Sequence, residues 1–269
     1  MSVEKPKKSL GQHWLFDIDS LEAMCKAAEI VAEDTVLEVG PGLGTLTEVI
    51  LSNGANVIAV EYDQELFTHL SSEVNKVSKC DTKKLKVVNE DILKFDVTKL
   101  PKNYKICANI PYYLTSNLIR KMLESENPPS IMALLIQKEV AERIVAKPGD
   151  MSVLAVATQY YAEVELHELV LAKLFTPPPK VDSQIIKIKC RKQPLFPDID
   201  TQKFFIIVKA GFSEKRKKLR SSLSGGLHIS KTEVDEILKK ANISSHARAQ
   251  ELTLEHWHKI YDVISETYC

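Results

Sequence analysis

The stretch LEVGPGLGTLTE, residues 37–48, joins an apolar segment to an amphipathic one through three glycines. The apolar side, TVLEVG (35–40), predicts a short buried strand, and TLTEVILSNG (45–54) predicts a helix that stops near Gly54. A glycine turn between a strand and a helix lets a ligand approach the backbone, and it lies where open α/β sheets bind ligands. The stretch therefore predicts an α/β fold with a ligand site at this turn.

The spacing of these glycines differs from two common phosphate-binding motifs. Gly40, Gly42 and Gly44 form G-P-G-L-G, and Thr45 stands where the dinucleotide pattern G-x-G-x-x-G would place its third glycine. The turn is not a P-loop either, because no Gly-Lys-Ser/Thr follows. On this motif alone, a tight turn without a ligand remains an open alternative.

Apolar segments alternate with helical patterns along the first two thirds of the chain. We predict further strands at NVIAVE (56–61), LKVVNED (85–91), YKICANI (104–110), SIMALLIQ (130–137) and QIIKIKC (184–190), and helices at 18–30, 62–77, TSNLIRKMLES (115–125) and KEVAERIVA (138–146). Short apolar strands that alternate with helices are typical of a parallel sheet covered on both faces. The pattern therefore predicts a doubly wound α/β domain.

The pattern changes beyond Val170. FTPPPKVDS (175–183) contains three consecutive prolines and cannot be helical. RKQPLFPDID reads as a linker, and the remainder predicts helices only: TQKFFIIVKAGF (201–212), EKRKKLRSSL (214–223), KTEVDEILKKA (231–241) and LEHWHKIYDVISETY (254–268). We therefore predict two domains, a Rossmann-like domain over residues 1–192 and a small all-helical domain over residues 193–269.

Composition excludes several classes of protein. The 269 residues are 44% hydrophobic and 27% charged, an ordinary globular balance. No run approaches the roughly 18 apolar residues of a membrane span, and the basic N-terminus lacks the apolar region of a secretory signal. The five cysteines are scattered without a CxxC pair, which argues against a zinc site or a disulfide framework. We expect a cytoplasmic protein without a metal ion.

Charge is balanced overall but clustered in two places. The formal net charge is zero, which by itself gives no sign of nucleic-acid binding. KPKK (5–8) and EKRKKLR (214–220) are nevertheless strongly basic. Each cluster is either a solvated face or a patch that contacts phosphates.

Two acidic residues follow strands on the side of the sheet where the glycine turn lies. Glu61 ends the second predicted strand, about twenty residues beyond the glycines, where a carboxylate accepts ribose hydroxyls. Asp91 follows the third strand and precedes Ile92, so an acceptor for an adenine amine stands beside an apolar surface for the ring. A ribose acceptor without a phosphate loop indicates an adenosine ligand that carries an amino acid, as S-adenosylmethionine does.

CANIPYYLTSN (107–117) places polar and aromatic groups at the end of the fourth strand. Asn109 lies on the same rim as the glycine turn, and Pro111 stiffens the backbone that follows. Tyr112 or Tyr113 offers a ring on which a base can stack. The alternative is a strand end with two core tyrosines, and we expect Tyr113 to pack inward.

Taken together, these motifs resemble the rRNA adenine dimethyltransferase family. The similarity covers nearly the whole chain, in the order KKSLGQHWL, EVGPGLGTLT, NEDIL, NIPYYLTS, QKEVAERIVAKPG, LFTPPPKVDS, AGFSEKRKKLRSSL and RAQELTLEHW. PPPKVDS and GFSEKRKKLR look like the small-subunit branch, which modifies two adjacent adenosines near the 3′ end of that RNA. One departure is Trp14, which stands where the family often has Phe.

The resemblance implies S-adenosyl-L-methionine as cofactor and assigns roles to residues. It implies cofactor contacts at His13, Leu15, Gly40, Gly42, Glu61, Tyr62, Asp91, Ile92 and Asn109, and a catalytic run of Asn109, Ile110, Pro111 and Tyr112. Phe175 and Phe212 are candidates for a second aromatic face on the substrate, or else ordinary core residues. Lys215, Arg216, Lys217, Lys218 and Arg220 are candidates for contacts with rRNA phosphates.

The resemblance implies a partner as well. We expect small-subunit rRNA or the immature small ribosomal subunit as substrate, bound by a monomer. Two alternatives remain: an RNA-binding assembly factor with little turnover, and an amino-methyltransferase of another substrate, including large-subunit rRNA. The complete set of site residues favours an active enzyme, and the basic C-terminal segment favours RNA.

Overall fold

The computed structural model describes residues 6–7, 10–77, 82–214 and 216–268. The chain forms two compact units, Met1–Ala141 with Ala162–Cys190, and Glu142–Tyr161 with Arg191–Cys269. The sequence predicts one boundary, between residues 192 and 193, and does not anticipate that residues 142–161 group with the C-terminal helices. One reason for this grouping is Tyr160, whose buried ring stacks on Phe204 at a centroid distance of 5.2 Å.

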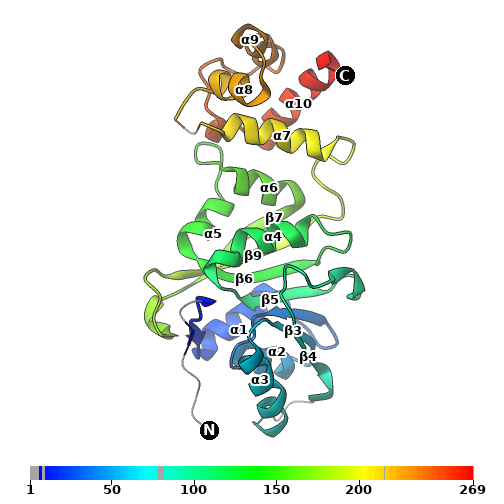
Figure 1. Cartoon of the computed structure of the whole chain (residues 1–269), viewed down its shortest axis with the longest axis vertical. Coiled ribbons are helices and arrows are strands. Elements are labelled where there is room, and N and C mark those ends of the chain that lie inside the picture. Colours follow the sequence, from blue (N-terminus) through cyan, green and yellow to red (C-terminus); the bar gives the residue numbers. More distant parts are fainter. Residues whose placement is uncertain (1–5, 8–9, 78–81, 215, 269) are drawn as a thin grey trace. The chain divides into compact units, whose positions relative to one another are not determined.

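The first unit is built on a seven-stranded sheet in the order β4-β3-β2-β5-β6-β9-β7 with helices packed on it (Figure 1). Its strands are β2 (Thr35–Val39), β3 (Asn56–Glu61), β4 (Leu85–Asn89), β5 (Lys105–Asn109), β6 (Ile131–Gln137), β7 (Ala162–Val170) and β9 (Ser183–Cys190). The helices are α1 (Ile18–Ala27), α2 (Thr45–Ser52), α3 (Gln64–Val77), α4 (Thr115–Leu123) and the start of α5 (Lys138–Ile144). Two short strands, β1 (Trp14–Leu15) and β8 (Phe175–Thr176), pair separately.

The α/β class is confirmed, but the sheet is mixed. Strands β4, β3, β2, β5 and β6 run parallel to one another, whereas β9 is antiparallel to both β6 and β7. The predicted all-parallel sheet is therefore wrong at this edge. The sequence did not reveal β7, because this edge strand exposes most of its residues and lacks a continuous apolar run.

A hydrophobic core of the first unit lies between the sheet and helices α1 and α2. Met24 and Cys25 of α1 and Ile50 of α2 belong to one cluster with Val36 of β2 and Cys107 of β5. Asp17 caps α1, its carboxylate accepting the Ser20 N–H at 3.0 Å. This packing holds the strands whose ends carry the polar residues of interest.

The second unit is helical, as the sequence predicts for the C-terminal part. It contains the rest of α5, α6 (Val153–Tyr161), α7 (Thr201–Phe212), α8 (Leu219–Leu227), α9 (Lys231–Lys240), the 3₁₀ turn η6 (Ala249–Glu251) and α10 (Leu254–Tyr268). Phe204, Val208 and Trp257 are fully buried in its core. The unit therefore has its own hydrophobic core.

The basic segment 214–218 is not helical where it is described. Helix α7 ends at Phe212, and α8 begins at Leu219 after an extended Lys218 with φ −64° and ψ 148°. Lys215 lies outside the described residues. The predicted helix 214–223 is thus wrong in its first half, because a run of cations repels itself in a helix and the buried Phe212 and Leu219 anchor only its two ends.

Two adjacent glycines in α8 give a matched test of helix packing. A β-carbon at Gly226 would lie 2.6 Å from the Ala210 β-carbon on α7, whereas one at Gly225 would meet no atom within 4 Å. We expect Gly226→Ala to destabilise the protein by about 1–3 kcal/mol through overpacking, and Gly225→Ala to be neutral or stabilising by up to about 1 kcal/mol. Urea unfolding measures both, and equal effects of the two variants would contradict this packing.

Candidate functional site

Three parallel strands bring their polar ends to one edge of the sheet. Strand β2 pairs with β3 on one side and with β5 on the other, so Gly40, Glu61 and Asn109 follow or end neighbouring strands. The direction of the strand order reverses between β2 and β5, with β3 and β4 on one side and β6 on the other. Open α/β sheets bind ligands at such a switch point.

The glycine turn adopts a backbone that few other residues tolerate. Gly40 has φ +65° and Gly42 has φ +59°, both in the left-handed region. The Gly40 N–H donates to the Val60 carbonyl oxygen at 2.9 Å, which ties the turn to β3. A β-carbon at Gly40 would meet no atom within 4 Å, so open space lies beside the turn.

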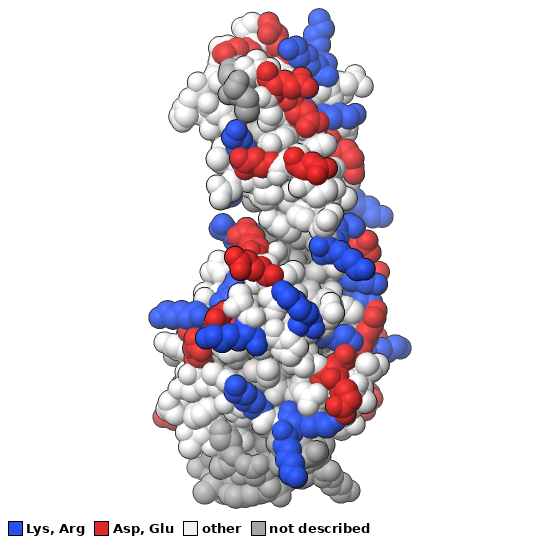
Figure 2. Space-filling model, turned by 90° about the vertical axis from the view of Figure 1, so that its right-hand side faces the viewer, with Lys and Arg blue, Asp and Glu red and all other residues white. Residues whose placement is uncertain are grey.

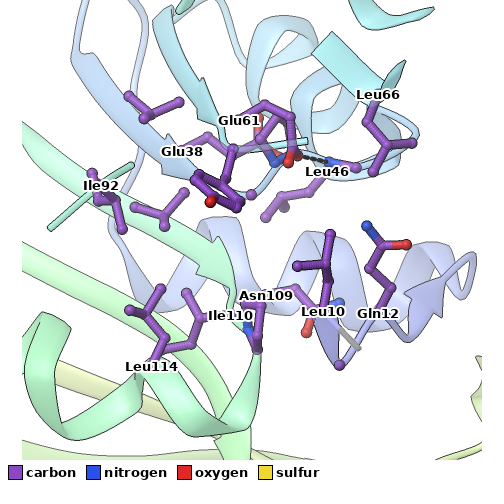
Figure 3. Close-up of a pocket in the computed structure, with 18 of the residues that line it drawn as sticks. Leu10, Gln12, Glu38, Leu46, Glu61, Leu66, Ile92, Asn109, Ile110 and Leu114 are labelled. Carbon is purple, nitrogen blue, oxygen red and sulfur yellow. Dashed lines mark hydrogen bonds between the residues drawn. The ribbon is translucent and has the colours of Figure 1, made fainter. Parts of the chain in front are cut away.

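A cavity of about 330 Å³ fills this space. Every residue predicted to bind the cofactor lines it, namely His13, Leu15, Gly40, Gly42, Glu61, Tyr62, Asp91, Ile92 and Asn109, and so do Ile110, Pro111 and Tyr112. Glu38 and Glu61 lie on one wall, and Asn109 and Ile110 lie on the facing wall (Figure 3). The structure therefore brings together positions that the sequence separates by almost one hundred residues.

Glu61 is held by the backbone and keeps the capacity to bind a ligand. Its Oε2 accepts the Gly42 N–H at 3.2 Å, and its Oε1 accepts the Asp63 N–H at 2.8 Å. A carboxylate has about four acceptor positions, so these backbone donors leave acceptor capacity for a ligand hydroxyl. Burial raises the pKa of Glu61, and the backbone donors partly offset this effect.

Asn109 is oriented by a contact with the N-terminal segment. Its Nδ2 donates to the His13 carbonyl oxygen at 3.2 Å. Because the amino group is used in this way, the side-chain oxygen is left as the acceptor for a substrate. The backbone of Ile110 and Pro111 continues along the same wall of the cavity.

The segment FTPPPKVDS (175–183) holds the N-terminal residues that line the cavity. Leu15 and Trp14 of β1 pair with Phe175 and Thr176 of β8. The His13 Nδ1–H donates to the Pro177 carbonyl oxygen at 2.7 Å. The sequence marked this proline-rich segment as a family feature, and the structure shows that it fixes the N-terminal residues of the site.

Two consecutive tyrosines in the 3₁₀ turn η4 (Tyr112–Leu114) have different environments. Tyr112 is half-buried; its hydroxyl lies 2.9 Å from the Ser183 Oγ, and its ring faces the His13 ring at 6.0 Å. Tyr113 is 65% exposed at the rim of the cavity, so the prediction that it packs inward is wrong.

Several lining residues were not predicted as site residues, and Glu38 and Trp14 are the two with notable polar groups. Glu38 is fully buried within β2, where its Oε2 accepts the Thr47 hydroxyl at 2.6 Å. Trp14 is 9% exposed, and its indole Nε1 has no hydrogen-bond partner among the described residues. An acid inside the apolar run TVLEV was the available signal for Glu38, because a buried carboxyl is costly unless it serves the site.

Comparison with known proteins gives the same assignment as the geometry. A model of the family described as ribosomal RNA adenine dimethylase matches residues 3–266. The chain belongs to the ribosomal RNA adenine dimethylase family.

Members and structural neighbours of this family match nearly the whole chain. The Ribosomal RNA small subunit methyltransferase A of Dehalococcoides mccartyi is 37% identical over 98% of this chain and 90% of its own. The protein of the same name from Clostridioides difficile is 36% identical over 97% and 91%. A dimethyladenosine transferase from Plasmodium falciparum superposes with a TM-score of 0.79 at 25% identity, covering 94% of this chain and 98% of that one. The 23S rRNA methyltransferase ErmE superposes with a TM-score of 0.73 at 26% sequence identity, covering 94% of this chain and 99% of its own.

As a member of the ribosomal RNA adenine dimethylase family, the protein is a methyltransferase that uses S-adenosyl-L-methionine. The residues present fit this cofactor. Glu61 offers acceptor positions for ribose hydroxyls, and the buried Ile92 offers an apolar surface beside Asp91 for the adenine. The open space at Gly40 and the unpartnered Trp14 N–H suit the amino-acid end.

Those predicted RNA-contacting residues that the structure describes are not among the residues lining this cavity. Phe175 and Phe212 are 3% and 8% exposed in the cores of their respective units, which favours a packing role. Arg220 is held in an ion pair, its Nη2 lying 2.6 Å from the Asp235 Oδ2. The Lys217 Nζ lies 2.7 Å from the Glu214 Oε2, and the Lys218 Nζ lies 2.8 Å from the His246 Nδ1. Arg216, Lys217 and Lys218 are all exposed.

Charged groups are mixed on the surface. On the face shown in Figure 2, basic and acidic side chains are interspersed, in keeping with the zero net charge. In the described part of the chain, none of the helices has the length and apolar character needed to cross a bilayer. Over the same residues, no group of three or more His, Cys, Asp and Glu side chains is arranged to hold a metal ion.

The buried carboxyl of Glu38 predicts a dependence of stability on pH. Burial, with a smaller contribution from Glu61, raises its pKa from 4.5 to about 8, although the Thr47 hydroxyl opposes the shift. The folded protein thus binds this proton more tightly than the unfolded chain. The stabilisation is complete below about pH 4.5 and is lost as the pH rises to about 8, by at most about 1.4 kcal/mol per pH unit.

Glu38→Gln removes this titrating group. We expect its free energy of unfolding, measured by urea at several values between pH 5 and 8.5, to decline less with pH than that of the wild type. Glu22→Gln, an exposed position on α1, is the control and keeps the wild-type slope. Identical slopes for Glu38→Gln and the wild type would show that Glu38 is ionised throughout.

Proposed function

We propose that the protein transfers methyl groups to N6 of two adjacent adenosines near the 3′ end of small-subunit rRNA, giving N6,N6-dimethyladenosines during ribosome biogenesis. The observation that carries the proposal is that the Asn109 to Tyr112 run lines the same cavity as Glu61, with Asn109 and Ile110 on the wall that faces Glu61 (Figure 3). Two curated relatives bear the name Ribosomal RNA small subunit methyltransferase A, which supports the small-subunit substrate.

The chemistry requires help because the adenine amine is a poor nucleophile, its lone pair being delocalised into the ring. The cofactor supplies the methyl group. The side-chain oxygen of Asn109 and the carbonyl oxygen of Ile110 accept the two N–H groups of the amine. These hydrogen bonds favour a pyramidal nitrogen and stabilise the positive charge that develops there. The charged product is acidic and loses its proton to water, so no general base is needed.

The surrounding residues supply geometry. Pro111 fixes the turn that aims both acceptors, and positioning of this kind lowers a barrier by several kcal/mol, on the order of 7 or more in favourable cases. The His13 carbonyl oxygen holds the amide of Asn109 at 3.2 Å. The ring of Tyr112, anchored through Ser183 at 2.9 Å, is the platform on which an unpaired or flipped adenine stacks.

The binding of RNA outside the cavity is assigned to the segment between α7 and α8. Arg216, Lys217 and Lys218 are exposed there, and the interactions of the two lysines are with exposed partners that phosphates can replace. Lys215 belongs to the same proposal but lies outside the described residues. Arg220 is a weaker candidate, since releasing it would leave Asp235 unpaired.

Removal of the amide acceptor tests the catalytic assignment. We expect Asn109→Ala to lower the rate of methyl transfer by about 10²–10³-fold or more, because one preorganised acceptor is removed. The melting temperature stays near that of the wild type. Asn117→Ala, an exposed position on α4, is the matched control and keeps full activity. An Asn109→Ala variant that dimethylates at the wild-type rate would overturn the assignment.

The substrate is tested with immature small subunits that lack these methyl groups. Incubation with radiolabelled cofactor, followed by mapping of the modified nucleotides, is expected to give two adjacent dimethylated adenosines near the 3′ end. Labelling of large subunits instead would favour the activity named for ErmE, to which the fold is also similar. Stable binding to small subunits without incorporation would favour an assembly factor.

Salt dependence tests the RNA-binding segment. We expect simultaneous replacement of Arg216, Lys217 and Lys218 by Ala to weaken rRNA binding and to reduce the slope of log K against log salt by about 1 for each phosphate that the variant no longer neutralises. The cofactor affinity, measured by calorimetry, is expected not to change. An unaltered salt slope would place the RNA path elsewhere.

A further inference from the structure

The N-terminal basic cluster KPKK contains a lysine whose charge is engaged within the protein. The Lys7 Nζ lies 2.9 Å from the Asp63 Oδ2 and 3.1 Å from its Oδ1, and it also contacts the Glu65 carboxylate. The Asp63 side chain is only 4% exposed. Of the two alternatives drawn from the sequence, a solvated face and a phosphate-contacting patch, neither describes a lysine paired with a buried acid.

Asp63 connects this lysine to the ribose-binding wall. Its backbone N–H donates to the Glu61 Oε1 at 2.8 Å, and its own Oδ1 accepts the Glu65 N–H at 2.9 Å. Burial opposes ionisation of Asp63, but the Lys7 ammonium and the Glu65 N–H outweigh it and lower the pKa of this carboxyl. The carboxylate that holds Lys7 thus stands two residues from the predicted cofactor acceptor.

Lys7 also begins the segment that forms another wall of the cavity. Its backbone N–H donates to the Gln12 Oε1 at 2.8 Å, and its carbonyl oxygen accepts the Leu10 N–H at 3.0 Å. Residues 10–15 line the cavity. The far end of the segment is fixed by the Thr45 hydroxyl, which donates to the Leu15 carbonyl oxygen at 2.9 Å, and by the pairing of β1 with β8.

We propose that Lys7 is a positioning residue, a latch that closes the N-terminal segment over the cofactor cavity by pairing with Asp63 and Glu65. The segment is attached at Leu15 through Thr45 and at His13 through Pro177 and Asn109, so the residues before His13 depend on this latch. Without it, the part of the wall formed by Leu10 and Gln12 spends part of its time open, and the cofactor binds only to the closed fraction. The proposal rests on the cofactor assignment and does not depend on which RNA is methylated.

The latch and a phosphate contact make opposite predictions for two charge changes. Lys7→Met removes a positive charge and Asp63→Asn removes a negative one. Lys7→Met breaks the latch, and Asp63→Asn removes its buried partner and leaves only the exposed Glu65, so both are expected to weaken binding of S-adenosylhomocysteine or the cofactor, by about five- to tenfold if the closed fraction falls to about 0.1–0.2. A phosphate contact by Lys7 would be weakened by the first substitution and left intact or strengthened by the second.

Isothermal titration calorimetry of the full chain with S-adenosylhomocysteine measures this directly. The double variant Lys7→Met, Asp63→Asn is expected to bind about as weakly as either single variant, because the two residues act as one unit. Lys7→Arg restores most of the affinity, since a guanidinium can reach the same carboxylates. In steady-state assays, KM for the cofactor rises while kcat at saturating cofactor stays close to the wild-type value.

A second Lys–Asp pair in the same unit serves as the control. Lys99 lies 3.3 Å from Asp96, exposed and outside the residues that line the cavity. Lys99→Met is therefore expected to leave cofactor affinity unchanged. Circular dichroism melts of all variants report whether the fold is retained, and the charge-neutral double variant guards against an effect of net charge alone.

Two outcomes would overturn the latch. The first is unchanged cofactor affinity in Lys7→Met together with weaker, less salt-dependent RNA binding, which would make Lys7 a phosphate contact. The second is wild-type affinity in both single variants. These results are independent of the proposed rRNA substrate, because a failure of that proposal appears only in the mapping of methylated nucleotides and leaves the calorimetric comparison valid.

Discussion

The site depends on the parallel pairing of β2 with β3 on one side and with β5 on the other. Parallel strands end at a common edge, so this pairing alone brings the glycine turn, Glu61 and Asn109 to one place. The helices that pack on the sheet, with the cluster around Met24 and Ile50, keep the strand ends in register. A change that shifted β5 by one residue would turn Asn109 to the other face.

The carboxyl ends of these strands would by themselves be open to water, and the N-terminal segment forms a further wall of the cavity. It is attached to the sheet domain at β8, at Thr45 and, through Lys7, at Asp63. Because the His13 carbonyl oxygen also accepts the Asn109 amide N–H, the segment both lines the cavity and orients the side chain that we propose to be catalytic. In our proposal, cofactor binding and catalysis are therefore linked through a few hydrogen bonds rather than through a large interface.

Much of the fold was predictable from local patterns. The strand 56–61 and the helices 201–212 and 254–268 coincide with β3, α7 and α10. The strand is a short apolar run, and the helices begin after Asp200 and Thr253, whose side chains accept backbone N–H groups of the first turn. The antiparallel edge was not predictable, since β7 is largely exposed and β1 and β8 have only two residues each. The basic segment before α8 was wrongly predicted to be helical. The two helices on either side of it end and begin at the buried residues Phe212 and Leu219, and burial is not visible in the local sequence.

The sequence by itself determined the α/β class, the glycine turn and the candidate residues at the ends of three strands, because these follow from short-range periodicity and from the chemistry of single side chains. Only the tertiary structure decided which groups meet. It paired Lys7 with Asp63 across more than fifty residues, buried Glu38 against Thr47, and exposed Tyr113 beside the half-buried Tyr112. Such contacts depend on how segments that are far apart in the sequence pack together, and local sequence patterns do not specify this packing.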